Sequence, residues 1–369
     1  MHGPIADHNE GTDLDTIADD ELEVTLGVDT HLDQHAAAVL DPIGRLLGAT
    51  SVPATVAGCE ELLTWASSFG LVTRAGVEGT GCYGAAVARF LQAAGVHVVE
   101  VTRATRVEGR HRGKSDPLDA QAAAMAVLAG RSAAVPKDRS GIVESIRLLR
   151  VARQTAVKAR SQAVIQLKAI LVSAPEPLRQ LRALNTRELI KRCASARPGR
   201  DRDPVTVTRR VLRSIARRYG DLDAEIHALE AELDELVTLA APRLLAEHSV
   251  GRETAAKLLT VAGDNPERLR SHAAFAALCG ASPVEASSGK TARHRLNRGG
   301  DRQANNALYT IAMVRMQHHP ETKAYVTRRT EEGKTRREIR RCLMRNLARR
   351  LYPLLIADLQ DAKTIPLLT

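Results

Sequence analysis

The sequence predicts an α/β N-terminal domain followed by a basic, mainly helical remainder. β-rich runs alternate with helical patterns up to about residue 135, and no strand pattern follows. The second half instead holds long helical runs, one of which carries a leucine heptad. With 369 residues, of which 44% are hydrophobic, the chain is long enough for two or three domains.

The opening of the first domain predicts an antiparallel meander. Three β-rich runs occupy residues 22–30, 34–41 and 45–53, and the turn sequence DPIG separates the last two. Residues 1–21 before them are acidic and polar without periodicity, which predicts a disordered extension.

Two helices and two strands are expected next. A helix should cover about 56–69, a buried strand 71–78, a helix should begin near Cys82, and a strand should cover 96–102. The order strand-strand-strand-helix-strand-helix-strand is typical of an α/β domain with a mixed sheet.

Two long helices are expected beyond this domain, over 142–172 and 221–240. The segments 174–178 and 196–204 between them have loop composition. In the second helix, apolar residues recur at coiled-coil spacing: Leu222, Ile226, Leu229, Leu233 and Leu236. This seam fits equally a hairpin within one chain and a dimerisation element.

The last third reads as a further helical unit that begins near residue 246. The segment SVGRETAAKLLTVAGDNPERL fits either a helix-hairpin-helix, which presents backbone amides to phosphates, or two helices joined by a plain turn. Residues 290–350 hold seventeen Lys or Arg against five acids, which favours a nucleic-acid surface. The expected division is 1–21 acidic extension, 22–135 α/β catalytic domain, 136–244 helical coiled-coil arm, 245–332 serine-containing domain and 333–369 basic helical tail.

Charge and composition narrow the class of binding partner that we expect. Residues 1–23 hold eight of the 43 acids and no Lys or Arg, so the rest carries 53 basic against 35 acidic residues despite a net charge of only +10. Such an excess of positive charge attracts polyanions such as nucleic acids. Aromatic residues make up only 2% of the chain, so base stacking cannot be the main source of affinity for a nucleic acid. No membrane span, signal peptide or paired-cysteine motif is present, so we expect a cytoplasmic protein without zinc or disulfides.

Four carboxylates lie at the ends of predicted elements. Asp29 ends the first strand in GVDTH, and Glu78 ends the central strand in VEGTG. In KSDPLDA, Asp116 fits a helix N-cap, Pro117 the first helical position, and Asp119 lies one turn onward on the same side. Ligands gather at strand ends in α/β sheets, so the four side chains are expected to meet.

Four clustered carboxylates repel one another unless a cation neutralises them, and hard oxygen ligands suit Mg²⁺ or Mn²⁺. Two such ions would flank a phosphodiester and stabilise its attacking and leaving oxygens. Taken singly, each acid also fits a plain structural role, as do the turn acids Asp33 and Asp41.

A second candidate site is the segment ASSGKTARHRLNRGGDRQANNAL, where Ser287 and Ser288 precede Gly289. A serine hydroxyl needs activation, and cationic neighbours would stabilise a phosphorane-like transition state. By composition alone, this loop also fits an ordinary turn. The side chains expected to contact nucleic acid are Lys114, Lys290, Arg293, His294, Arg295, Arg298 and Arg302.

Together these motifs resemble the DEDD-type insertion-sequence transposases. That group combines an N-terminal RuvC-like domain of the ribonuclease H fold with a C-terminal serine-containing transposase domain. The resemblance covers about residues 24–350 and rests on GVDTH, VEGTGCYG, KSDPLDAQ and the serine segment that begins ASPVEASSGK. The acidic N-terminal extension is not part of the family pattern.

The resemblance implies that Asp29, Glu78, Asp116 and Asp119 hold Mg²⁺. It also implies that a loop serine attacks DNA to give a covalent phosphoserine, with Ser288 favoured because it directly precedes the glycine and Ser287 in reserve. The acidic site of one subunit would meet the serine of another, in a homo-oligomer that is a dimer or a tetramer. The family further implies a structured guide RNA encoded by the element.

Three rival hypotheses make different predictions. A Holliday-junction-type nuclease would use water and cut without the serine. An inactive relative that only binds nucleic acid would not depend on Asp29 or Glu78, and the complete set of four acids argues against it. A sugar-kinase-like ATPase would need glycine-rich phosphate loops in a second, similar domain, which the helical second half lacks.

Overall fold

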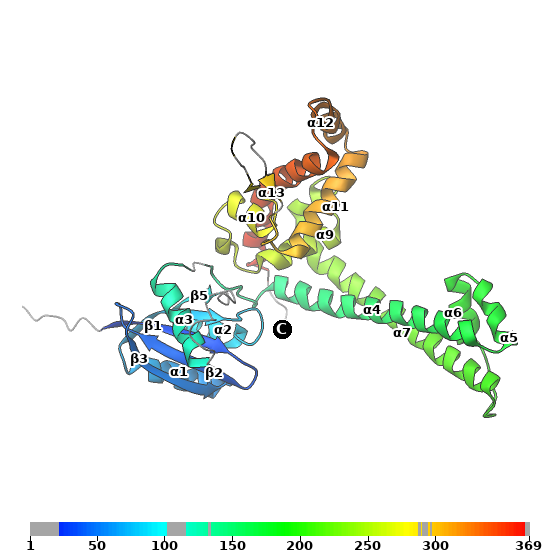
Figure 1. Cartoon of the computed structure of the whole chain (residues 1–369), viewed down its shortest axis with the longest axis horizontal. Helices are drawn as coiled ribbons and strands as arrows, with labels where there is room; N and C mark the ends of the chain where they lie inside the picture. The colour runs from blue at the N-terminus through cyan, green and yellow to red at the C-terminus, as the bar shows by residue number, and fades with distance from the viewer. Residues whose placement is uncertain are drawn as a thin grey trace, which may run out of the picture. The chain divides into compact units, whose positions relative to one another are not determined.

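The computed structural model describes residues 22–101, 116–131, 134–286, 289, 294–295 and 297–365. Its contacts divide the chain into two compact units, Met1–Pro136 and Lys137–Thr369 (Figure 1). The predicted disordered extension lies outside the described residues. The finer domain boundaries at 244 and 332 stay predictions.

The first unit contains a five-stranded mixed sheet, which confirms the predicted α/β class. The strands are β1 (Glu23–Thr30), β2 (Gln34–Leu40), β3 (Leu46–Pro53), β4 (Leu71–Glu78) and β5 (His97–Val101). Their order in the sheet is β3-β2-β1-β4-β5. The first three pair antiparallel as the predicted meander, whereas β4 runs parallel to both β1 and β5.

Helices cover both faces of this sheet. The helices α1 (Val56–Ser67) and α2 (Ala85–Ala93) bury Leu62 and Leu91 against alternate residues of β1, among them Leu26. The opposite face packs against α3 (Asp116–Leu128), where Ala123 and Val127 join the buried valines of β5. In β5, Val98 belongs to the first core, whereas Val99 and Val101 belong to the second, because alternate residues of a strand point to opposite faces.

Two helix starts differ from the prediction. The helix α2 begins at Ala85, three residues after Cys82, because a turn comes first: the amides of Cys82 and Gly84 both donate to the Gly79 carbonyl (2.8 and 3.1 Å). Gly79 has φ +64°, a conformation that favours glycine. The helix α3 includes Asp116 as its first residue, so Asp116 is not the N-cap that the sequence predicted.

The second unit is built on a long helix pair, α4 (Ile142–Ser173) and α7 (Pro204–Ala240), which lie side by side (Figure 1). The pair is antiparallel, since Arg153 bonds Glu230 while Arg160 bonds Asp223 farther along. The expected start of the second helix at residue 221 was wrong. The Asp203 carboxylate accepts from the amides of Val205 and Thr206, and Pro204 occupies the first helical position, so the helix begins seventeen residues earlier.

Short helices close the far end of the pair. They are α5 (Glu176–Arg179), the 3₁₀ turn η2 (Gln180–Ala183) and α6 (Thr186–Ala194). Residues 174–178, predicted as loop, therefore include a short helix. A small core of Leu171, Leu189 and Leu212 holds this tip together.

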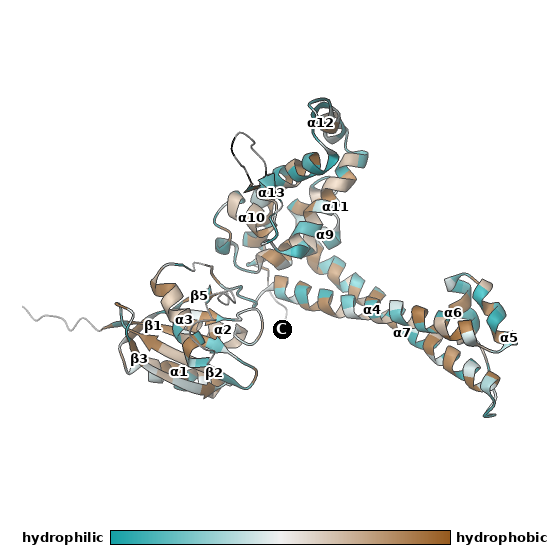
Figure 2. Ribbon diagram, viewed as in Figure 1, coloured by the Kyte–Doolittle hydropathy of each residue, from teal (hydrophilic) through white to brown (hydrophobic). Residues whose placement is uncertain are grey.

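The remaining elements follow the helix pair. They are α8 (Pro242–Ala246), α9 (Arg252–Ala262), η3 (Pro266–Arg268), α10 (His272–Leu278), β6 (Val284–Glu285), β7 (His294–Arg295), α11 (Arg302–His318), α12 (Pro320–Glu331) and α13 (Arg336–Ala362). Among them, α8, α9, α10, α11 and α13 share one hydrophobic core with the base of the helix pair. Ile146 of α4 and Val237 of α7 pack in the same core as Phe275, Leu308 and Leu351. The expected basic tail contains α13, whose apolar residues are part of this core. Figure 2 shows hydrophilic and hydrophobic residues mixed along α13.

Two further observations concern membrane spans and cysteines among the described residues. None of their helices is long and apolar enough to cross a membrane. All five cysteines lie among them and none is in a disulfide.

Candidate active site

The first unit brings two of the predicted acids to the ends of neighbouring parallel strands. Val28 of β1 pairs with Val77 of β4, and Asp29 and Glu78 are the next residue on each strand. Both are buried, with 1% and 7% of their surface exposed. The Thr30 hydroxyl donates to the Glu78 carbonyl oxygen at 2.9 Å, which ties the two strand ends together.

The helix α3 brings the other two acids to the same face of the sheet. It packs backbone to backbone on glycines: a Cβ on Gly27 would lie 2.0 Å from the Ala120 oxygen, and one on Gly76 would lie 2.5 Å from the Ala123 oxygen. Two residues beyond these glycines, Asp29 and Glu78 point to the same face as the glycines do, because strand side chains alternate. The first turn of α3, which carries Asp116 and Asp119, therefore faces the strand ends.

His31 connects the strand and helix acids. Its Nε2 lies 3.1 Å from Oδ2 of Asp29 and 3.5 Å from Oδ1 of Asp116. One ligand atom from each of these three residues lies within 4.8 Å of the other two. Two carboxylate oxygens and one imidazole nitrogen form a donor set that suits a divalent cation.

The sequence reasoning missed His31. His31 lies two residues after Asp29, on the same side of an extended chain, but many polar residues after a strand share this spacing, so it did not single out His31. The structure brings Asp29 and Asp116 together through His31. Glu78 ends the neighbouring strand β4 and Asp119 lies in the first turn of α3, but neither belongs to this group of three.

A second histidine lies on the adjacent strand. His35 pairs in register with Thr30 and is 2% exposed. Burial lowers the pKa of His35, and the nearby His31 acts in the same direction, against the raising effects of Gln34 and Asp29. His35 is therefore neutral at neutral pH and adds no positive charge beside the acids.

The predicted serine site is described only in part. Ser287 and Ser288 lie outside the described residues, as do Lys114, Lys290 and Arg293. Flanking them, β6 and β7 form a two-stranded hairpin in which Val284 pairs with Arg295, and Glu285 with His294. Arg298 is exposed on the segment before α11, and Arg302 is exposed as the first residue of α11.

The C-terminal side of this hairpin is fixed to α10. A Cβ on Gly300 would lie 2.2 Å from the Gly280 nitrogen, so only glycine permits this approach. The Asp301 amide donates to the Leu278 oxygen (2.6 Å), and the Asn305 side-chain amide donates to the Cys279 oxygen (2.9 Å). Gly300 of the RGGD sequence thus serves close packing against Gly280.

Comparison with known proteins matches both units to one group. Residues 26–174 match a family model of DEDD-type IS110 transposases, described as a transposase. Residues 241–327 match a second model, described as transposase of the IS116/IS110/IS902 family. The insertion element IS110 uncharacterized 43.6 kDa protein of Streptomyces coelicolor is 32% identical over 154 residues. That match covers 41% of this chain and 37% of the Streptomyces protein, so the chain spans well under half of that relative's length.

Proposed function

We propose that this chain, which belongs to the IS110 family of insertion-sequence transposases, cuts and rejoins the DNA of an insertion sequence by phosphodiester transfer. The observation that carries the proposal is the cluster of Asp29, His31 and Asp116 at the end of β1 and the start of α3. A divalent-metal site of this kind is the expected machinery for charge stabilisation at a phosphodiester. The finer assignment of the first unit as a ribonuclease H-like domain belongs to the same proposal.

The metal would be held by Asp29, Glu78, Asp116 and Asp119, with the His31 imidazole as a nitrogen donor between Asp29 and Asp116. When bound, Mg²⁺ or Mn²⁺ would stabilise the charge that develops on the attacking and leaving oxygens. The protein's own contribution is to hold the acids in place: β1 and β4 fix two of them on a buried sheet, and the first turn of α3 supplies the other two. Asp29 and Glu78 are buried, and a bound cation would lower the cost of holding their negative charges away from water.

The nucleophile would be Ser288, with Ser287 as the reserve. Its Oγ would form a bond to the phosphorus while the P–O bond to the adjoining DNA strand breaks. The serine proton would pass to a base, and the released strand end would leave as a hydroxyl after it takes up a proton. A second reaction of the same kind, with a DNA hydroxyl attacking the phosphoserine, would rejoin the strands and free the serine. The Ser-Gly pattern amid cationic residues supports this role.

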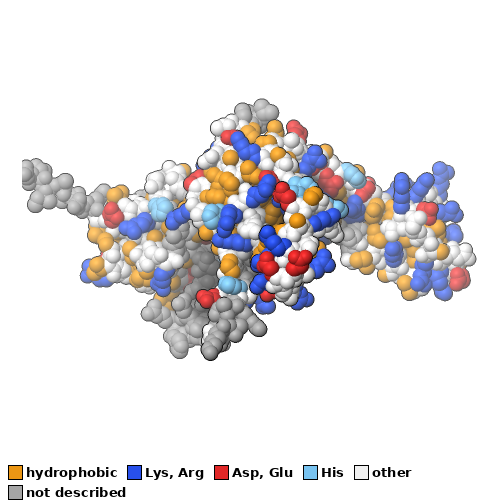
Figure 3. Space-filling view, turned by 90° about the horizontal axis from the view of Figure 1, so that it is seen from above, with side chains coloured by type: hydrophobic (Ala, Val, Ile, Leu, Met, Phe, Trp, Pro, Cys, Tyr) orange, Lys and Arg blue, Asp and Glu red, His pale blue; other side chains and the backbone are white. Residues whose placement is uncertain are grey.

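Nucleic-acid partners beyond the cut DNA belong to the same proposal. A structured guide RNA would need basic surface, and Lys and Arg side chains gather over the tip formed by α5 and α6 (Figure 3). A dimer or tetramer would supply the acidic site and the serine from different subunits. The leucine seam of α7 no longer supports that assembly, because Leu233 is buried in a core with residues of α4.

The test is a search for DNA joined covalently to the protein. Wild type, Ser288→Ala, Ser287→Ala and Asp29→Asn would be incubated with labelled insertion-sequence ends, flanking RNA and Mg²⁺, then run on denaturing gels. Asp33→Asn is the matched control, because Asp33 is an exposed acid four residues from Asp29. We expect an adduct with wild type and Asp33→Asn that is lost in Ser288→Ala and Asp29→Asn. Cleavage that persists without an adduct in Ser288→Ala would instead identify a nuclease that uses water.

A further inference from the structure

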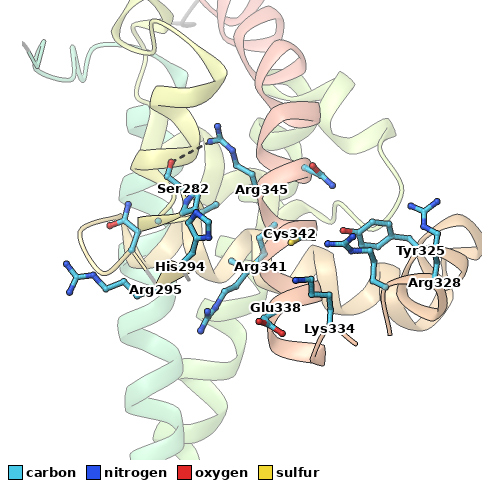
Figure 4. A pocket seen from close by; sticks show the side chains of 17 residues that line it. Ser282, His294, Arg295, Tyr325, Arg328, Lys334, Glu338, Arg341, Cys342 and Arg345 are labelled. Carbon is cyan, nitrogen blue, oxygen red and sulfur yellow. Dashed lines mark hydrogen bonds between the residues drawn. The ribbon is translucent and has the colours of Figure 1, made fainter. Parts of the chain in front are cut away.

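The second unit contains a cavity of about 870 Å³ that neither the acid cluster nor the proposed role of the serine explains. Its wall comes from residues 280–283, β7, α12 and α13. Figure 4 shows His294 and Arg295 of β7 toward one side, Tyr325 and Arg328 of α12 toward the other, and Lys334 and Arg341 between them. The cavity therefore adjoins the hairpin whose two strands flank the serine segment.

Positive side chains dominate this wall. Six cations line it: Arg295, Arg328, Arg329, Lys334, Arg341 and Arg345. The one carboxylate among the lining residues is that of Glu338. Neutral groups able to donate hydrogen bonds, such as the side-chain amides of Asn297 and Asn346, complete the lining.

The Glu338 carboxylate already forms hydrogen bonds at the start of α13. Its carboxylate accepts from the Thr335 amide and hydroxyl, each at 2.8 Å, as a capping box. These hydrogen bonds, chiefly from the Thr335 backbone, hold the pKa of Glu338 below its usual range, with smaller effects from Lys334 and Arg341. Glu338 thus serves the helix cap, and its one charge leaves the cavity strongly cationic.

The cations differ in how far they are neutralised. Arg328 and Arg329 both pair with Glu332, the former at 4.0 Å. Among the residues that the structure describes, Arg295, Lys334, Arg341 and Arg345 form no ion pair with a carboxylate. The Arg345 guanidinium makes one long contact, 3.5 Å to the Ser282 hydroxyl. Four positive charges are therefore available to an anionic ligand.

We propose that this cavity binds the phosphate backbone of a DNA strand, next to the hairpin formed by β6 and β7. Guanidinium groups match phosphate geometry, and cations contributed by several elements suit successive phosphates better than one small anion. The proposal rests on the proposed function for the identity of the strand. The surface formed by β7, the turn before α13 and α13 itself would position DNA through its phosphates, without reading its sequence.

The test compares two double variants of the full chain. Lys334→Ala with Arg341→Ala removes two cavity charges, whereas Arg336→Ala with Arg349→Ala removes two exposed charges of α13 that do not line the cavity. Fluorescence anisotropy with labelled duplex DNA, single-stranded DNA and RNA would give affinity as a function of salt, in EDTA so that no cutting occurs. Circular dichroism melting would check that both variants fold.

We expect the cavity variant to bind DNA on the order of tenfold more weakly, with its log-log salt slope reduced by roughly 1.4–1.8 for two lost phosphate contacts. The outer variant should keep most of the affinity and slope. A Lys334→Arg and Arg341→Lys variant should restore binding. Equal losses in both alanine variants, or no change in slope, would overturn the proposal, as would a loss confined to RNA. Because binding is measured without cleavage, a failure to find a serine adduct would leave this result unaffected.

Discussion

Gly27 of β1 lies so close to the carbonyl oxygen of Ala120 in α3 that a Cβ on this glycine would be 2.0 Å from it. This contact fixes how closely α3 packs against the sheet. Because Asp116 lies one turn before Ala120, and Asp29 two residues beyond Gly27, the same contact brings Asp116 into reach of Asp29. The acid site therefore depends on a residue that has no side chain.

Gly27→Ala should destabilise the first unit and disrupt the acid cluster. The added methyl group must displace α3, an overpacking effect that typically costs about 1–3 kcal/mol or more. Thermal unfolding followed by circular dichroism and Mn²⁺ titration would measure both effects. Gly220→Ala is the matched control: nothing lies within 4 Å of its Cβ position inside α7, so it should stabilise the helix by about 0.5–1 kcal/mol. A Gly27→Ala protein with unchanged melting and metal binding would contradict the packing argument.

His31→Ala should weaken Mn²⁺ binding more than Mg²⁺ binding. An imidazole nitrogen suits transition-metal ions, whereas Mg²⁺ prefers oxygen ligands. We expect a loss of Mn²⁺ affinity on the order of tenfold, the scale seen when groups that support a metal are removed. Isothermal titration with each ion would measure this, with His97→Ala as a control because His97 is exposed on the edge strand β5. Equal losses for the two ions would assign His31 to positioning Asp29 instead.

Asp264→Asn should change how the stability of the second unit varies with pH. Asp264 is 8% exposed and its Oδ1 accepts from the Val143 amide (2.9 Å), which caps α4. Burial raises the pKa of Asp264, and the amides of Val143 and Gly141 oppose that shift. With a raised folded-state pKa, the folded chain binds more protons than the unfolded chain. Its contribution to stability is therefore fully present below the usual carboxyl range and is lost as pH rises through the raised value.

The asparagine variant keeps a cap acceptor but cannot titrate. The unfolding free energy of the variant should therefore increase relative to that of wild type as pH rises from below the usual carboxyl range toward neutral. Urea unfolding at several pH values would measure it. Asp201→Asn, which changes an exposed acid, should show no such trend. A constant difference across the pH range would mean that Asp264 titrates normally.

Local patterns predicted the strands well because they are short, apolar and bounded by turns. The run that ends at Glu78 matches β4 in both limits. The start of α7 was missed, although Asp203 followed by Pro204 is a typical helix N-cap with proline at the first helical position. The arginine-rich stretch and Gly220 that follow obscure the apolar periodicity of the helix.

Other features had no local signal. The order of strands in the sheet and the contact of Gly27 with α3 are tertiary, so no periodicity reveals them. His31 enters the acid site only because α3 lies over β1, and the approach of Gly300 to Gly280 likewise joins segments that the sequence separates. The acids could be predicted because each one lies at an element terminus, whereas their partner histidine could not be separated from any other polar residue after a strand.

The leucine seam of α7 holds the helix pair together within one chain. Ile226 is 2% exposed and lies between Asp223 and Glu230, which bond Arg160 and Arg153 of α4. Ile226→Ala should therefore lower the unfolding free energy by about 2–5 kcal/mol, the usual result of truncating a buried isoleucine. Leu239→Ala, which truncates a side chain of the same helix that is 53% exposed, should cost far less. Because both helices belong to one chain, the loss should be the same at low and high protein concentration in thermal melts. A loss that grew on dilution would mean that Ile226 also helps to hold two subunits together.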